Sequence, residues 1–248
     1  MGCSTVIWGP KGWAVNHALA KLAREHPVLR PRIKAYFLDL AEQTCCVYCR
    51  ASWARFLAES PPDMERPEEW MYAMHQKVNR KLWAQRLDAF LERVKPCKED
   101  EAKIREHYPM LCYEPTFEQV RHRLALSHPA SFSSLDVWTL VHAIALDTEG
   151  PGREAAAARF PDFLENLAAC IAGFKVYDSL VADLRRAAAC SRTVRDNLKA
   201  TCAAQVGCKS VHATCIRDFQ TSLSKQVQAL EKEARSMRSK ACSAGTCA

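Results

Sequence analysis

Glycine is scarce in this chain, and its scarcity limits the folds open to it. Only eight of the 248 residues are glycine, against a usual share of ~7%. Five of them, Gly2, Gly9, Gly12, Gly150 and Gly152, lie near the N-terminus or in one short stretch. Sandwiches, barrels and the phosphate loops of nucleotide-binding α/β folds depend on glycine in turns. The sequence therefore predicts an all-α protein.

Cysteine, in contrast, is abundant, with thirteen residues. A chain of this length buries enough apolar surface to fold without the disulfide staples that small secreted scaffolds need. We therefore expect many of the cysteines to serve chemistry.

Charge and hydropathy set milder limits. The formal net charge is +7, and no run of five like charges concentrates it. A basic nucleic-acid-binding helical protein is an alternative, but we expect no nucleic-acid partner. No apolar stretch approaches the ~18 residues that a membrane helix needs, and no signal-peptide pattern opens the chain. We expect a soluble protein without a membrane segment.

Helical periodicity, punctuated by prolines, runs through the first hundred residues. We expect helices after Pro10, after Pro31, from about Cys46, and from Pro67. The residues that share the inward face of each helix are, in chain order, Trp13, His17 and Ala20; Ile33, Phe37 and Leu40; Trp53, Phe56 and Leu57; and Met71, His75, Val78 and Leu82, and each set forms a stripe along its helix. Four helices joined by short loops predict a four-helix bundle.

The second half of the chain resembles a degenerate copy of the first. Trp13-x3-His17 recurs as Trp138-x3-His142, and Phe37-Leu38 recurs as Phe163-Leu164. In a similar register, Cys46-x2-Cys49 corresponds to Cys170-x2-Gly173, so the copy lacks one cysteine of the pair. Chance agreement between two helical segments is the alternative. We expect a first unit at 1–115, a second helical unit at 116–240 and a tail at 241–248. The second unit should include a long helix at 216–237 that packs on the rest of the protein or on a second subunit.

Cys46-Val47-Tyr48-Cys49 is the sharpest local motif. Cysteines three apart in the first turn of a helix share one face, and the positive end of the helix dipole lowers a thiol pKa. The spacing favours a redox pair; half of a zinc site or two buried thiols are the alternatives.

Two further pairs lie four residues apart on their helices, Trp13 with His17 and His75 with Asn79. Ordinary core packing explains one such pair. Two of them converging on a helix that begins with C-x-x-C favour walls for a flat aromatic cofactor.

Three blocks in order carry a family resemblance: Trp8-Gly9-Pro10-x2-Trp13-x3-His17, then Cys46-x2-Cys49-Arg50-x2-Trp53, then Trp70-x4-His75-x2-Val78-Asn79-Arg80-Lys81-Leu82. Residues 6–112 resemble the Erv/ALR family of FAD-linked sulfhydryl oxidases. Gln76 departs from the family's asparagine, and Trp83-Ala84 stands in place of its glycine-lysine.

The resemblance implies one FAD per chain, with Cys49 proximal to the flavin and Cys46 exchanging with dithiols. It implies a structural disulfide between Cys97 and Cys112, at a short closing helix, and no metal. The implied cofactor-binding residues are Trp8, Gly9, Trp13, His17, Cys49, Trp70, His75, Val78, Asn79, Lys81 and Leu82.

The tail acquires a function through the same resemblance. Cys242 and Cys247 resemble a shuttle pair that takes electrons from cysteine-containing protein substrates and passes them to Cys46/Cys49, then FAD, then O2, giving hydrogen peroxide; a cytochrome is an alternative acceptor. The resemblance implies a homodimer in the mitochondrial intermembrane space, or alternatively an enzyme of a large DNA virus. The rival function is a zinc-stabilised helical adaptor with Cys46, Cys49 and His75 as ligands.

The other cysteines fit several assignments. A hairpin at Gly207 would bring Cys202 near Cys208, so a disulfide or free thiols are both open there. Pairing among Cys170, Cys190, Cys202, Cys208 and Cys215 does not follow from the sequence, and Cys3 and Cys45 are expected as buried or free thiols.

Overall fold

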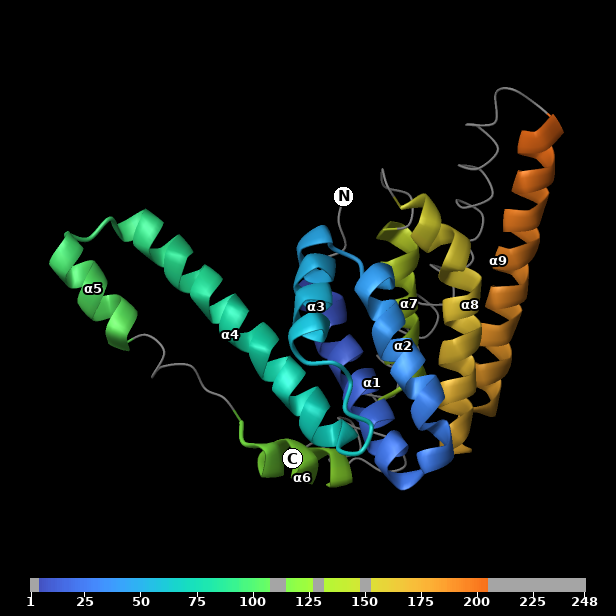
Figure 1. The fold of residues 1–248 in the computed structure, drawn as a ribbon, viewed down its shortest axis with the longest axis horizontal. Coiled ribbons are helices and arrows are strands. Elements are labelled where there is room, and N and C mark those ends of the chain that lie inside the picture. Colours follow the sequence, from blue (N-terminus) through green and yellow to red (C-terminus); the bar gives the residue numbers. More distant parts are fainter. Residues whose placement is uncertain (1–4, 108–114, 127–131, 148–152, 205–248) are drawn as a thin grey trace, which may run out of the picture.

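The computed structural model describes residues 5–107, 115–126, 132–147 and 153–204, and every regular element within these ranges is a helix (Figure 1). The all-α prediction is confirmed. In chain order the elements are α1 (Thr5–Glu25), the single turn η1 (Pro27–Leu29), α2 (Arg30–Gln43), α3 (Val47–Glu59), α4 (Pro67–Val94), α5 (Lys98–His107), α6 (Phe117–Leu126), α7 (Ser134–Asp147), α8 (Glu154–Ile171), the single turn η3 (Ala172–Phe174) and α9 (Asp178–Ala204).

Three of the four helices expected in the first hundred residues begin at or beside the predicted residue. Pro67 opens α4, with Glu68 and Glu69 beside the positive end of its dipole. Helix α1 differs, because it begins at Thr5 and contains Pro10. Pro10 is the sixth residue of this helix, so its missing N–H removes one intrahelical hydrogen bond, and the helix continues through it. None of the described helices is long and apolar enough to span a membrane.

Helix α1 occupies the centre of the molecule, in contact with α2, α4 and α7. Val15, Leu19 and Ala20 on this helix have no exposed surface. On the α2 side, the Tyr36 hydroxyl donates a hydrogen bond of 3.0 Å to Asn16 Oδ1, with both side chains buried. Alanines along α1 let its neighbours approach closely, so the orientation of each of its faces is fixed.

The predicted four-helix bundle is only partly visible in this packing. Helices α1 to α4 occur in the expected order, and α2 contacts α3. The outer half of α4, however, runs away from the other helices toward α5 (Figure 1). A closed bundle is therefore not established by the arrangement of these helices.

The second unit packs on the first through the elements that the repeat relates. Helix α7 lies against α1, and α8 lies against α2. Tyr36 of α2 stacks on Phe163 of α8 at 5.6 Å between ring centroids. One continuous buried cluster contains side chains from α1 to α4 and from α7 to α9. The predicted boundary near residue 115 thus separates two units that share a single hydrophobic core.

The repeat breaks down at its cysteines. Cys170 lies in the last turn of α8 and is fully buried, whereas Cys46 precedes a helix. A Cβ placed on Gly173 would lie 2.6 Å from Leu29 Cδ1 and 2.9 Å from Leu22 Cδ2. A side chain at this position would require both leucines to move. The alignment of Cys170-x2-Gly173 with the C-x-x-C pair therefore fails in three dimensions.

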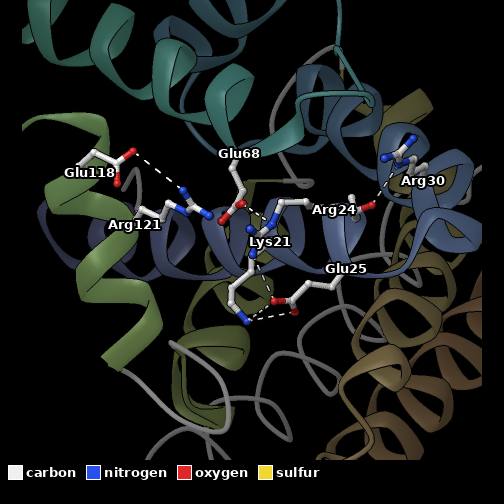
Figure 2. A network of polar contacts seen from close by, with 8 residues as sticks. Lys21, Arg24, Glu25, Arg30, Glu68, Glu118 and Arg121 are labelled. Atoms are coloured by element: carbon white, nitrogen blue, oxygen red, sulfur yellow. Dashed lines mark hydrogen bonds and ion pairs between the residues drawn. The ribbon is translucent and has the colours of Figure 1, made fainter.

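An ion-pair network joins α1 to the start of α4 and faces α6 (Figure 2). Glu68 of α4, only 7% exposed, accepts from Arg24 Nε at 2.6 Å. Burial raises the pKa of Glu68, while Arg24 and then Arg121 of α6 oppose that rise. The positive side chains thus offset part of the cost of burying this carboxylate.

The shared core predicts that the two units unfold together. Phe163, 1% exposed, fills space between α2 and α8, so Phe163→Ala should lower the free energy of unfolding by about 4 kcal/mol. Urea denaturation followed by circular dichroism should show one transition shifted as a whole. Phe90→Ala, on the outer half of α4 where the ring is 38% exposed, is the control and should cost less than about 1 kcal/mol. Two separate transitions would contradict a common core.

Candidate redox and cofactor site

Cys46 and Cys49 lie at the join between α2 and α3. Helix α2 ends at Gln43, and Cys46 is the N-cap of α3. The Cys46 carbonyl accepts hydrogen bonds of 3.0 Å from the backbone N–H of Cys49 and of Arg50, which closes the first turn. Both cysteines are half-buried free thiols, and Val47 and Tyr48 between them are 59% and 74% exposed. The pair is thus placed at the surface with an accessible apolar dipeptide beside it.

The backbone of Cys46 is strained, with φ 89° and ψ 110°. Non-glycine residues rarely adopt a positive φ, and such conformations cost on the order of 1–3 kcal/mol and cluster at functional sites. The outlier therefore marks this thiol as one whose position is imposed by the surrounding structure.

The electrostatics of Cys49 differ from the sequence expectation. Burial raises the pKa of Cys49 to about 12; a hydrogen bond with Cys46 and the proximity of that thiol act in the same direction, and Lys81 and Arg50 oppose them. The expectation that the helix N-terminus lowers the pKa of the pair is therefore wrong for Cys49. Removal of water from the thiolate is the largest cause and exceeds the opposing effect of Lys81 and Arg50.

Two lysines of α4 hold opposite ends of α3. Lys81 Nζ donates to the Tyr48 carbonyl at 3.2 Å and to Ser52 Oγ, beside the redox pair. One turn earlier, Lys77 Nζ contacts Glu59 at 3.0 Å and Ser60 Oγ at 2.9 Å at the other end of α3. Lys81 thereby brings a fixed positive charge to Cys49, whose charged form it favours.

A histidine pair joins α1 to α4. His17 Nε2 lies 2.9 Å from His75 Nδ1, one nitrogen donating and the other accepting. Burial lowers the pKa of His17 to about 3, with His75 adding to the effect, and lowers the pKa of His75 to about 4. Trp13 stacks on His75 with ring centroids 3.9 Å apart and planes 9° from parallel. The His17 ring is tilted by 45° to His75, so the group is a stacked pair with a tilted third ring, neutral and mostly sheltered from water.

Further aromatic rings extend this group into the core. Trp53, four residues after Cys49, lies 6.0 Å from Trp13 and 6.4 Å from Trp70 between ring centroids. The indole N–H of Trp53 donates to the Phe37 carbonyl and that of Trp70 to the Ser60 carbonyl, each at 3.0 Å. Trp70 is thus a deep member of an aromatic series that begins at the histidine pair.

The polar residues of the third block follow on the next turn of α4. Asn79 Nδ2 donates to Gln76 Oε1 at 3.1 Å, and Gln76 Nε2 donates to the Pro115 carbonyl at 3.3 Å. Val78 packs against the core cluster, whereas Leu82 is 43% exposed. Gln76, the departure from the family pattern, thus orients Asn79 and ties it to the segment preceding α6.

Two predicted cofactor residues lie apart from this group. Trp8 packs beside Gly12 near Leu140 of α7, and its buried Nε1 has no hydrogen-bond partner among the described residues. Gly9 has open space where a Cβ would be. The contacts of Trp8 place it at the interface with the second unit.

The other cysteines with a predicted role lie at an exposed position or outside the described residues. Cys97 is an exposed free thiol whose Sγ donates to Asp100 at 3.2 Å. Its expected partner Cys112, and the shuttle residues Cys242 and Cys247, lie outside the described residues, as does the predicted helix at 216–237. The structural disulfide and the shuttle therefore stay predictions.

The zinc alternative finds no ligand set in the described part of the chain, where no three His, Cys, Asp or Glu side chains lie close enough to hold a metal ion. Cys46, Cys49 and His75 do not converge as ligands would.

Comparison with known protein families, curated proteins and solved structures finds no match to this chain. The function must therefore be argued from the site itself.

Several residues that shape the site had no predicted role in it, although Trp53 belonged to the second motif block. Ser52 and Trp53 follow Cys49 by three and four positions, so helical spacing alone would have placed them on its face. Gln76 had a similar local signal. Nothing in the sequence signals Arg153, whose contact with the end of α2 spans more than a hundred positions.

The depressed histidine pKa values predict acid sensitivity. The unfolded chain binds a proton at His17 between about pH 6.5 and about pH 3, and the folded chain does not. Unfolding free energy should therefore fall as pH drops through this window, by about 2 kcal/mol from His17 between neutral pH and about pH 5. Urea titrations at the two pH values should show this loss, and His17→Gln should remove the share of His17 while His75, whose pKa is also lowered, keeps a smaller pH dependence. His107→Gln, at an exposed position on α5, is the control; a wild-type stability that does not change with pH would refute the assignment.

Proposed function

We propose that this protein is an FAD-dependent thiol oxidase that forms disulfides in protein substrates. One observation carries the proposal: α1, α3 and α4 bring Trp13 and His17, the Cys46/Cys49 pair with Trp53, and His75 with Lys81 into one connected neighbourhood. These three blocks are distant in sequence, and each supplies a different requirement: a flat wall, a dithiol and a fixed positive charge.

The residues present fit a flavin cofactor. Trp13 and His75 stack on each other with ring centroids 3.9 Å apart, so a flavin ring would lie against an outer face of this stack. The histidine ring nitrogens are neutral hydrogen-bonding groups, and Lys81 supplies a cation for a phosphate or an electron-rich ring. Trp13, His17, His75, Asn79 and Lys81 would hold FAD, in a bundle formed by α1 to α4. Bound FAD would accept two electrons from the dithiol and deliver them to O2, yielding hydrogen peroxide.

The protein's own residues perform the thiol chemistry. In the oxidised enzyme a substrate thiolate attacks Cys46 Sγ, the Cys46–Cys49 bond breaks, and Cys49 leaves as a thiolate. Lys81 and Arg50 stabilise that charge, in opposition to the burial of Cys49. The second substrate thiol then attacks the mixed disulfide, which releases the substrate disulfide and Cys46. Exposed Val47 and Tyr48 leave a path for this attack.

The tail completes the proposal. Cys242 and Cys247 would accept electrons from cysteine-containing proteins and pass them to Cys46/Cys49, within one chain or across a homodimer. A cytochrome could replace O2 as acceptor, and the mitochondrial intermembrane space is the compartment we propose. These parts rest on the family resemblance alone.

Cysteine variants test the relay. Cys49→Ser should retain flavin, seen as visible absorbance released on denaturation, and lose dithiothreitol-dependent O2 consumption by at least about a hundredfold. Cys247→Ser should oxidise dithiothreitol normally and act poorly on reduced protein substrates. Cys190→Ser, at an exposed position on α9, is the control. Purified wild-type protein that never acquires flavin when supplied with FAD would refute the proposal, as would full activity in the first two variants.

The two lysines of α4 provide a matched test of the charge beside Cys49. Lys81→Met should raise the pKa of Cys49 further and slow its alkylation by iodoacetamide by about tenfold near pH 8, because a nearby cation favours the thiolate. Lys77→Met, which releases only the far end of α3, should leave the rate unchanged. Site-resolved mass spectrometry of reduced protein gives both rates. Equal rates in the two variants would show that Lys81 acts only as a structural clamp.

A further inference from the structure

The second unit covers the C-terminal end of α2, immediately before the redox pair. Arg153, the residue that precedes α8, is only 7% exposed. Its guanidinium donates to the carbonyl of Glu42 through Nη1 and to the carbonyl of Gln43 at 3.5 Å through Nη2. These are the last two carbonyls of α2, which have no helical partner of their own. A cation at this negative helix end is also favoured by the dipole.

Two more contacts fasten the same end of α2 to α8. The Gln43 side chain, 1% exposed, donates through Nε2 to the Ala156 carbonyl at 3.0 Å. Arg159 forms an ion pair with the Glu42 carboxylate at the surface. The buried contacts fix the backbone of residues 42 and 43, whereas the Arg159 pair holds only a side chain.

The strained Cys46 follows three residues after Gln43. A positive φ at a non-glycine residue persists only where the structure on both sides holds it. On the C-terminal side of Cys46, Lys81 holds the first turn of α3. On the N-terminal side, Thr44 is held locally, because its carbonyl accepts from Arg50 Nη1 at 3.0 Å and its Oγ1 donates to the Leu40 carbonyl at 2.6 Å. Arg153 is the contact on this side that the second unit supplies.

We propose that the second unit acts as a positioning element for the redox pair, and that Arg153 is its principal positioning residue. Held between fixed ends, the Cys46 thiol is kept against Cys49 in the conformation that the surrounding contacts impose. Such preorganisation raises the effective concentration of one thiol at the other and so favours the disulfide. The inference rests on the proposed thiol chemistry, but it concerns the dithiol–disulfide equilibrium of this pair and does not depend on the flavin.

Loss of the anchor should make the Cys46–Cys49 disulfide easier to reduce. In full-length Arg153→Met, we expect the equilibrium constant for disulfide formation against glutathione to fall about tenfold, a rise of ~30 mV in the potential of the couple. Arg153→Lys keeps the charge but offers a single donor group for two carbonyls, so an intermediate shift is expected. Arg159→Met, on the same face of contact between α8 and α2 but without a bond to the α2 carbonyls, is the matched control and should equal wild type.

The measurement is a glutathione redox titration followed by alkylation, with fragment masses that distinguish Cys46 and Cys49 from Cys45. Urea denaturation of each variant is measured in parallel. A shift in the equilibrium constant with Arg153→Met and not with Arg159→Met supports the proposal. A loss of stability with an unchanged equilibrium constant overturns it, because Arg153 would then be only a structural contact. If Arg153→Met does not fold, the equilibrium constant of Arg153→Lys is compared with that of Arg159→Met in the same way.

Failure of the oxidase proposal gives a different result. A wild-type protein without flavin or O2 consumption refutes the proposed function, while the titration of Cys46/Cys49 in the Arg153 variants still reports on the positioning role. Conversely, if the protein is an active flavoprotein but its Cys46/Cys49 redox equilibrium does not change in the Arg153 variants, the proposed function stands and the positioning role of Arg153 is wrong.

Discussion

The enclosure of α1 on three sides is the constraint on which the rest of the structure depends. Helices α2, α4 and α7 each cover one of its faces, and its central residues are completely buried. Rotation of α1 would bury polar groups without partners, because Asn16 meets Tyr36 of α2 on one side and His17 meets His75 of α4 on another. Close packing therefore fixes Trp13 and His17 in register with α4.

The redox pair depends on a second constraint, the change of direction between α2 and α3. One helix ends and another begins within three residues, so carbonyls that lack helical partners and a strained Cys46 lie side by side. Side chains from three directions satisfy or hold this segment: Arg50 from α3, Lys81 from α4 and Arg153 from the start of α8. The arrangement explains how a second unit that retains no C-x-x-C pair can still contribute to the site of the first.

Local features of the sequence were good guides to the elements. Pro67 with its following acids, the stripe of α2 and the C-x-x-C at the start of α3 lie where spacing placed them. The stripe of α4 holds as far as Val78, whereas Leu82 is 43% exposed. The failures have identifiable causes. Helix α1 tolerates Pro10 in its interior, because the packing of the helix outweighs the one hydrogen bond that the proline removes. The pKa of Cys49 is raised by desolvation that no local pattern reveals. Gly173 packs against leucines of α1 and η1 and does not correspond to a cysteine of the pair.

The sequence by itself determined that the chain is helical, where three of the four helices expected in the first hundred residues start, and that two thiols lie at the start of one of them. Backbone hydrogen bonding and side-chain spacing act over three or four residues, which is why these features are local. Tertiary structure alone decided that His17 meets a histidine 58 positions away, that Trp8 faces α7, and that Arg153 reaches the end of α2 more than a hundred positions earlier. Burial and the pairing of polar groups between distant helices control those outcomes, and both depend on which faces meet when the core closes.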